Sequence, residues 1–144
     1  MYSRKIINVA FIMELVTSGL FIYASIYFLN IYSDTYLIYR PPPYVVYREI
    51  DVGVFGLLLL SLAIITLFLL AVPTRNTKRG LTRLMKFNYL SVALICIMEF
   101  QNYIVWNNLN VSDIILITIA LIPAVIIQYW LYHNKSNYQK NGTP

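Results

Sequence analysis

The chain has 144 residues, of which 59% are hydrophobic and only 12% are charged. Soluble domains carry roughly 25% charged residues, and a soluble domain of this size could not keep so much apolar surface away from water. The formal net charge is +5, but the basic residues lie between the apolar stretches, which is typical of topology signals and lipid-headgroup contacts. Composition therefore excludes a soluble domain and argues against nucleic-acid binding, which needs a folded basic face.

Four stretches are long enough to cross a bilayer, which takes about 20 mainly apolar residues in a helix. The predicted spans are residues 6–29, 52–72, 87–106 and 114–131. Each should be helical, because backbone groups in hydrocarbon must form their hydrogen bonds within the segment. Runs such as residues 56–60 do not alternate in polarity as barrel strands would. We predict an all-α fold, a polytopic membrane protein whose residues 1–144 form one four-transmembrane-helix bundle.

The Lys and Arg residues are distributed unequally between the two sides of the predicted bundle. Nine of the eleven lie in the N-terminal tail, in residues 73–86 and in the C-terminal tail, whereas Arg40 and Arg48 alone lie on the other side. Positive charge normally stays in the cytoplasm. The bias predicts that the N and C termini are both on the cytoplasmic side of the cell (plasma) membrane, with an organelle membrane as the alternative.

Two segments between the spans are long enough to have a role of their own. Residues 30–51 are predicted to form an outer loop, in which three consecutive prolines favour an extended polyproline-type segment and five tyrosines offer amphipathic rings. This loop is either an aromatic interface belt with a stiff turn or a docking surface for another subunit. Residues 73–86 are predicted to form an inner basic loop that touches anionic lipid. The candidate docking residues are Tyr36, Tyr39, Arg40, Pro42, Tyr44 and Tyr47.

Polar residues recur at helical spacing on one face of three predicted spans. The faces that carry them consist of Ala10, Glu14, Thr17, Ser18, Phe21 and Ser25 in the first span, Asn88, Ser91, Ile95, Glu99, Asn102 and Trp106 in the third, and Thr118, Leu121, Val125 and Gln128 in the fourth. Such stripes normally face a bundle interior. The second span has no comparable stripe, and we expect it to face lipid over most of its circumference.

Glu14 and Glu99 are the ionisable residues inside the predicted spans, where a charge costs about 2.5–3.5 kcal/mol on insertion scales. A rise of about 1.5 Å per residue puts Glu14 near the level of Gln128, with Glu99 about one turn further out. No Lys or Arg lies at that depth, so each glutamate should be protonated, hydrogen-bonded, open to water or paired with another chain. Glu14, Glu99, Asn102 and Gln128 are the candidates for structural polar contacts, proton or cation handling, or substrate binding.

Residues that would indicate an enzyme are absent from the sequence. His133 is the single histidine and Cys96 the single cysteine, so neither bis-histidine haem ligation nor an internal disulfide can form. The sequence has no metalloprotease, serine-hydrolase or phosphate-loop motif, and no family motif covers a meaningful part of it. We therefore expect no enzymatic activity, no cofactor and no metal.

Two functions fit this pattern. The first is a small non-catalytic accessory or structural subunit of a larger membrane complex, for example a respiratory or other energy-transducing one. The alternative is a small oligomeric transporter or channel in which the intramembrane glutamates handle protons or cations. The expected partners are the lipid bilayer and either larger membrane subunits or further copies of the chain, but not nucleic acid.

Overall fold

The computed structural model describes residues 2–38, 43–107 and 111–134, with side chains described in these ranges except at residues 2–4, 32–38, 43–51, 74 and 106. These residues form the helices α1 (Tyr2–Ile38), α2 (Pro43–Ala71), α3 (Lys78–Trp106) and α4 (Val111–His133), with a short 3-10 turn, η1 (Pro73–Asn76), between α2 and α3. Each of the four α-helices is long and apolar enough to cross a membrane. The predicted all-helical class is confirmed, as are four helices of membrane-spanning length and hydropathy.

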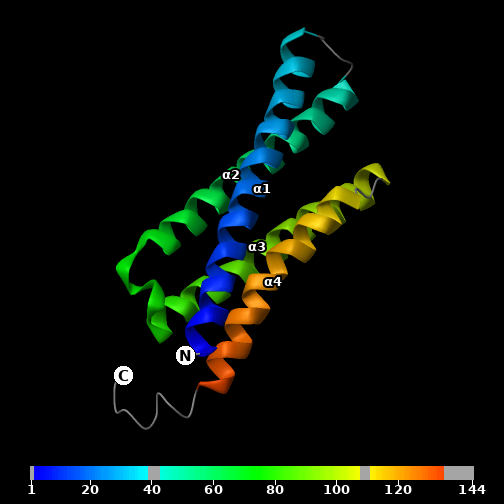
Figure 1. Ribbon diagram of the computed structural model, residues 1–144. Helices are drawn as coiled ribbons and strands as arrows, with labels where there is room; N and C mark the ends of the chain where they lie inside the picture. Colours follow the sequence, from blue (N-terminus) through cyan, green and yellow to red (C-terminus); the bar gives the residue numbers. More distant parts are fainter. Residues whose placement is uncertain (1, 39–42, 108–110, 135–144) are drawn as a thin grey trace.

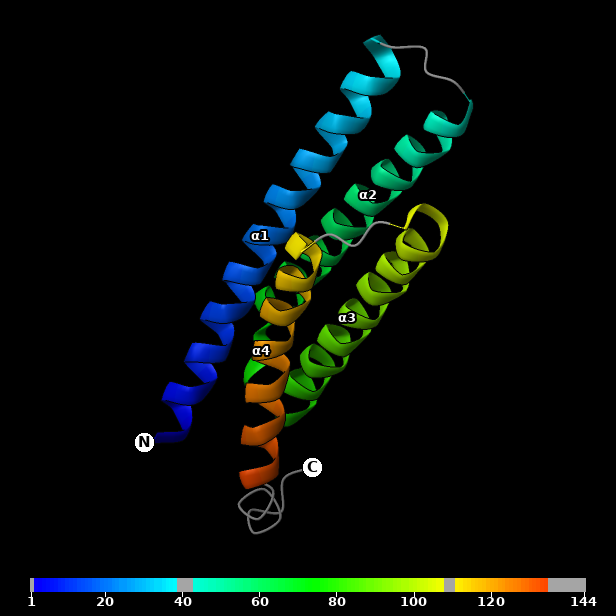
Figure 2. The same ribbon diagram turned by 90° about the vertical axis from the view of Figure 1, so that its right-hand side faces the viewer.

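The helices form an up-and-down arrangement in which α1 and α2 make one hairpin and α3 and α4 another (Figure 1). The start of α1 and the end of α4 lie at the same end of the bundle in both views (Figure 2). Helix α1 packs against α2 and α4, and α3 packs against α4 and, over a smaller area, α2. No Cα atoms of α1 and α3 lie within 8 Å of each other in the described parts of these helices. Helices α1 and α3 are therefore diagonal neighbours across the bundle axis.

Residues 30–51, which were predicted to form a loop between the first two spans, are helical over most of that range. Helix α1 continues to Ile38 and α2 already begins at Pro43, which leaves only residues 39–42 outside the described helices. Proline is well suited to the first position of a helix, because its φ angle is already helical and its missing N–H would have no partner there. With 37 residues α1 is about 55 Å long, well beyond a hydrocarbon core of about 30 Å. The α1–α2 hairpin accordingly extends past the α3–α4 hairpin (Figure 2).

The inner basic segment is also more helical than predicted. Helix α3 begins at Lys78, nine residues before the predicted span, and the side chain of Thr77 caps it by accepting a hydrogen bond from the Gly80 N–H at 3.0 Å. Arg75 Nη1 donates to the Leu70 carbonyl at the end of α2, and its guanidinium lies 5.5 Å from the centre of the Phe11 ring on α1. The turn between α2 and α3 is thereby attached to α1.

Helix α2 leaves most of its span unburied, as predicted, but it is also the helix with the largest buried share. Of its most apolar 18-residue stretch 39% is buried inside the bundle, against 28–33% for the other three helices. Phe55, Leu59, Leu62 and Ala63 form the centre of one apolar core cluster together with Phe21 and Ile95. Small residues explain the burial, because Gly56 approaches the Leu29 and Phe28 side chains of α1 closely. A second apolar cluster, around Ile7, Leu70, Leu84 and Ile127, closes the opposite end.

Candidate functional site

The polar stripe of α1 faces the bundle interior as predicted. Glu14, Thr17, Ser18 and Ser25 are all buried, and Glu14 is only 1% exposed. Thr17 donates its hydroxyl to the Met13 carbonyl one turn earlier, which satisfies it within its own helix. Leu15, Val16 and Ile26, on the other side of the helix, are about half exposed. A helix of period 3.6 that buries its polar face and exposes its apolar face is suited to a hydrocarbon surrounding.

Helix α3 presents a matching inward stripe. Asn88, Ser91, Ile95 and Glu99 are buried, whereas Asn102 is half-buried. The side chain of Trp106, the last member of the predicted stripe, lies outside the described residues. Together, Glu14, Ser18 and Ser25 of α1 and Asn88, Ser91 and Glu99 of α3 form what we call the axial polar column.

A hydrogen bond connects the α1 and α3 sides of this column at the level of Glu14. The Asn88 side-chain amide donates to Glu14 Oε1 across the diagonal between α1 and α3. The second carboxyl oxygen of Glu14 is buried without a hydrogen-bond partner, and so are the hydroxyl oxygens of Ser18 and Ser25 further along the same face. Buried polar atoms are normally hydrogen-bonded, so this row of exceptions marks a place where a proton, water or small cation could be accommodated.

Glu99 forms a second carboxyl site further along α3. The Asn102 amide donates to Glu99 Oε1 at 3.5 Å, one turn away on the same helix. Because Asn88 lies beside Glu14, the eleven residues from Asn88 to Glu99 separate the two carboxyl groups by about 16 Å along the bundle axis. The predicted separation of about one helical turn between Glu14 and Glu99 is wrong. It counted the depth of Glu99 from residue 87, whereas α3 begins at Lys78.

Gln128 does not face the axial polar column. It is exposed and accepts a hydrogen bond from the Tyr89 hydroxyl on α3. Thr118, on the same predicted face of α4, is also exposed and donates to the Ile114 carbonyl of its own helix. The predicted inward face of α4 is therefore wrong. The helix instead buries Asp113, Leu116, Ala120, Pro123, Ala124 and Ile127.

Asp113 is a buried acid that the sequence analysis missed. It lies in the first turn of α4 and is 1% exposed, and neither carboxyl oxygen has a hydrogen-bond partner. The predicted span began at residue 114, so Asp113 was counted with the connecting segment. Its position within one turn of a long apolar run is the signal that could have identified it, because α4 begins two residues earlier.

In the described part of the chain, no basic side chain is buried inside the bundle with these acids. Every Lys, Arg and His whose side chain the structure describes is exposed, whereas Glu14, Glu99 and Asp113 are all buried. A carboxylate in a low-dielectric surrounding needs either a proton or a compensating cation. Within the described ranges, no group of three or more His, Cys, Asp and Glu side chains could hold a metal ion.

The predicted docking residues are not placed by the structure. Tyr39, Arg40 and Pro42 lie outside the described residues. Tyr36, Tyr44 and Tyr47 belong to the helical ends of α1 and α2, but their side chains are outside the described residues as well. The docking surface therefore stays a prediction.

Comparison of the chain with protein-family models, curated proteins and solved structures gave no match.

Proposed function

We propose that this chain is a small membrane protein that takes up and releases protons or small cations at carboxyl groups inside its four-helix bundle. One observation carries the proposal: the axial polar column holds two acids, one amide and three hydroxyls, while every described basic side chain is exposed. An interior of this composition attracts positive charge and repels anions. Structural polar contacts alone would be expected to leave fewer buried hydroxyl and carboxyl oxygens without partners.

The carboxyl, amide and hydroxyl groups have separate roles in this function. Glu14 and Glu99 carry the proton or bind the cation, and Asn88 and Asn102 orient their carboxyl groups by donating to one oxygen of each. Ser18, one turn from Glu14, offers a hydroxyl that can both donate and accept a hydrogen bond. The gap of about 16 Å between the carboxyl sites is too long for direct transfer, so ordered water or a change in helix packing has to connect them.

The orientation in the membrane follows from the charge bias and is part of this proposal. Seven of the eleven Lys and Arg belong to described segments at the end of the bundle where α1 begins, and Lys135 and Lys140 follow the end of α4 in the sequence, which puts that end and both termini on the cytoplasmic side. Glu14 then lies in the cytoplasmic half of the bundle and Glu99 in the outer half. The cell membrane is the proposed location.

Proton flux into liposomes tests this function. The purified chain is reconstituted with a pH-sensitive dye inside, and a potassium diffusion potential drives the flux. We expect Glu14→Gln and Glu99→Gln each to lower the flux by at least about tenfold, since each removes a group that can release a proton. Thr118→Val is the matched control, because this exposed hydroxyl bonds only to its own helix, and it should leave the flux unchanged. Absence of proton and alkali-cation flux in the unmodified protein contradicts the proposal.

A second function, an accessory subunit of a larger membrane complex, is favoured by one different observation. Tyr89 and Gln128 form a hydrogen-bonded polar pair on the outer surface of α3 and α4, where lipid chains offer no polar partner. An adjoining protein subunit could supply further hydrogen bonds to this pair. The α1–α2 hairpin would then extend beyond the surface that this subunit covers on α3 and α4.

Purification in a mild detergent from the native host tests the accessory function. If the tagged chain arrives in fixed proportion with larger subunits, these partners identify the complex. Gln128→Leu, which leaves the axial polar column intact, should then lower their recovery, whereas Thr118→Val should not. Arrival as a homo-oligomer without other subunits contradicts the accessory function.

A further inference from the structure

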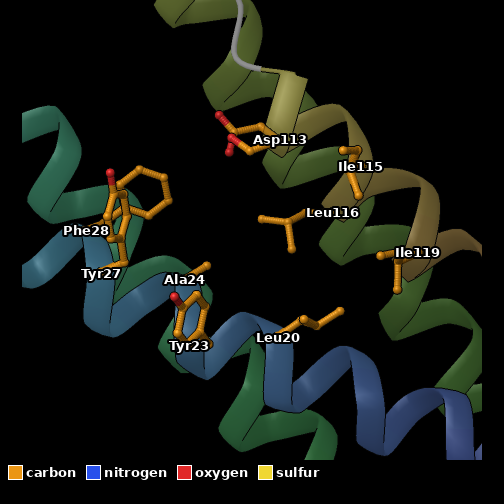
Figure 3. Close-up of a pocket in the computed structure, with 10 residues that line it drawn as sticks. Leu20, Tyr23, Ala24, Tyr27, Phe28, Asp113, Ile115, Leu116 and Ile119 are labelled. Carbon is orange, nitrogen blue, oxygen red and sulfur yellow. The ribbon is translucent and has the colours of Figure 1, made fainter.

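A cleft lies between α1 and α4 near the end of the bundle where α4 begins (Figure 3). Glu14 is not among its lining residues. Its volume is about 410 Å³, within the range of roughly 300–1,000 Å³ typical of small-molecule sites. Leu20 and Ala24 of α1 and Leu116 and Ile119 of α4 make most of its wall aliphatic. The cleft is therefore large enough for a small organic molecule and mainly apolar.

Asp113 is the charged group of this cleft. Figure 3 shows its carboxyl group extending from the start of α4 toward the side on which Tyr27 and Phe28 of α1 lie. An aspartate in the first turn of a helix usually accepts hydrogen bonds from backbone N–H groups or compensates the helix dipole. Here both carboxyl oxygens of Asp113 lack a hydrogen-bond partner although the residue is only 1% exposed. Helix capping thus does not account for the burial of this carboxyl group.

Aromatic rings form the opposite side of the cleft. Tyr23 and Tyr27 are 73% and 57% exposed and line it one turn apart on α1. Phe28 is half-buried and is held by an edge-to-face contact with Phe55 of α2, with ring centres 5.1 Å apart. The faces of aromatic rings attract cations, and a carboxylate beside several rings is the combination that recognises ammonium groups.

The lining excludes other kinds of ligand. Among the residues that the structure describes, the lining contains no Lys, Arg or His, so an anion would meet the aspartate and a described wall without positive charge. Calcium takes six to eight oxygen ligands, whereas this lining offers one carboxylate and the hydroxyls of Ser112, Tyr23 and Tyr27. A ligand with a single diffuse positive charge and an apolar body fits both the charge and the aliphatic wall.

We propose that this cleft binds a ligand that joins a positively charged organic nitrogen to an apolar body, with Asp113 as counter-ion and Tyr23 and Tyr27 against the cationic group. Leu20, Leu116 and Ile119 surround the apolar body. A free protonated or quaternary amine and an amine-bearing lipid headgroup share this chemistry.

Titration with benzyltrimethylammonium tests the proposal. The full chain is placed in nanodiscs of phosphatidylglycerol, which has no amine, and binding is measured by calorimetry. We expect saturable binding to the unmodified protein and roughly tenfold or weaker binding to Asp113→Asn, because the buried counter-ion is lost. Asp113→Asn keeps the size of the side chain, and its helicity and elution volume are compared with the unmodified protein.

Tyrosine variants keep the test decisive should Asp113→Asn fail to fold. Tyr23 is too exposed to support the core, so Tyr23→Leu should fold and weaken binding several-fold through loss of the ring, whereas Tyr23→Phe should bind like the unmodified protein. Tyr132→Leu, a similarly exposed tyrosine at the opposite end of α4, is the matched control and should have no effect. Equal binding by Tyr23→Leu and Tyr132→Leu overturns the proposal, as does absence of saturable binding.

Native mass spectrometry distinguishes the two sources of the ligand. In nanodiscs that also contain phosphatidylethanolamine, retention of this lipid by the unmodified protein but not by Asp113→Asn assigns the cleft to a lipid headgroup. Binding of the free amine without lipid retention assigns it to a soluble amine. Glu14→Gln should bind the amine like the unmodified protein, so loss of flux and loss of amine binding are independent results.

Discussion

Glu14 and Asn88 meet across the bundle axis although their helices are diagonal neighbours. Because no backbone of α1 and α3 comes close, the two long side chains themselves connect the hairpins at this level. A neutral or charged Glu14 can accept the hydrogen bond from the amide, so the contact persists if the carboxyl group changes its protonation. At the residue scale, Asn88 therefore combines a structural role with the orientation of a carboxyl group.

Replacement of Asn88 tests this combination. Asn88→Leu removes the donor and leaves the Glu14 carboxyl group buried without a hydrogen bond, so the free energy of unfolding should fall by about 1–3 kcal/mol. Asn102→Leu should cost less than about 1 kcal/mol, because Asn102 is half-buried and its bond to Glu99 is long. Unfolding in increasing fractions of a denaturing detergent, followed by tryptophan fluorescence, measures both. Equal losses of unfolding free energy in the two variants would show that the Glu14–Asn88 hydrogen bond stabilises the bundle no more than the Glu99–Asn102 bond does.

The periodicity of the sequence predicted the inward residues of α1 and α3, because one polar stripe on an otherwise apolar helix has a single favourable orientation in a bilayer. It failed for α4, in which Thr118 satisfies its hydroxyl within the helix and Gln128 finds Tyr89 on the outer surface. It also could not pair Glu14 with Asn88. Which polar groups meet depends on the relative rotation and register of two helices far apart in the chain, and no local pattern encodes that.

The length of α1 and the packing of α1 against α2 also differ from what hydropathy predicts. Hydropathy ended the predicted spans where the chain becomes polar, but helical hydrogen bonds continue beyond that point and α1 reaches Ile38. Hydropathy also gave no reason to expect that α2 has the largest buried share of the four helices, since a glycine adds no apolar side chain. The close approach of α1 and α2 depends on Gly56, where an added Cβ would lie 3.1 Å from Leu29 Cγ and 3.3 Å from Phe28 Cβ.

A pair of glycine substitutions tests the importance of this approach. Gly56→Ala should lower the free energy of unfolding by about 1–3 kcal/mol, because the tightly packed Leu29 and Phe28 must shift to admit the methyl group. Gly19→Ala is the matched control. A Cβ at Gly19 would meet nothing within 4 Å, and alanine favours a helix by about 0.8–1.0 kcal/mol in host peptides, so this variant should be neutral or slightly stabilised. Thermal unfolding in detergent, followed by circular dichroism, compares them. A neutral Gly56→Ala would mean that Leu29 moves aside without cost.

At the scale of the whole molecule, charge and polarity are arranged along the bundle axis. Lys5, Arg75 and the basic residues of the first turns of α3 lie at the end where α1 begins, and all of them are exposed. The acids Glu14, Glu99 and Asp113 are buried at successive heights between the helices. The basic end can contact anionic headgroups while the interior remains free of positive side chains in the described residues. The basic residues on which the proposed orientation depends are therefore kept away from the carboxyl groups.

Removal of inner charges tests the proposed orientation. Replacing Lys78, Arg79, Arg83, Lys86, Lys135 and Lys140 by Gln reduces the bias from nine against two to three against two. Arg75 is kept because it donates to the end of α2 and contacts Phe11. Since the Lys and Arg bias sets the orientation of membrane helices, this variant should insert in both orientations, whereas the control with Arg40 and Arg48 replaced by Gln should keep one. Reporters at the C terminus, a fluorescent protein active in the cytoplasm and a phosphatase active outside, measure the two populations. A unique orientation of the first variant would mean that helix packing, and not charge, determines the topology.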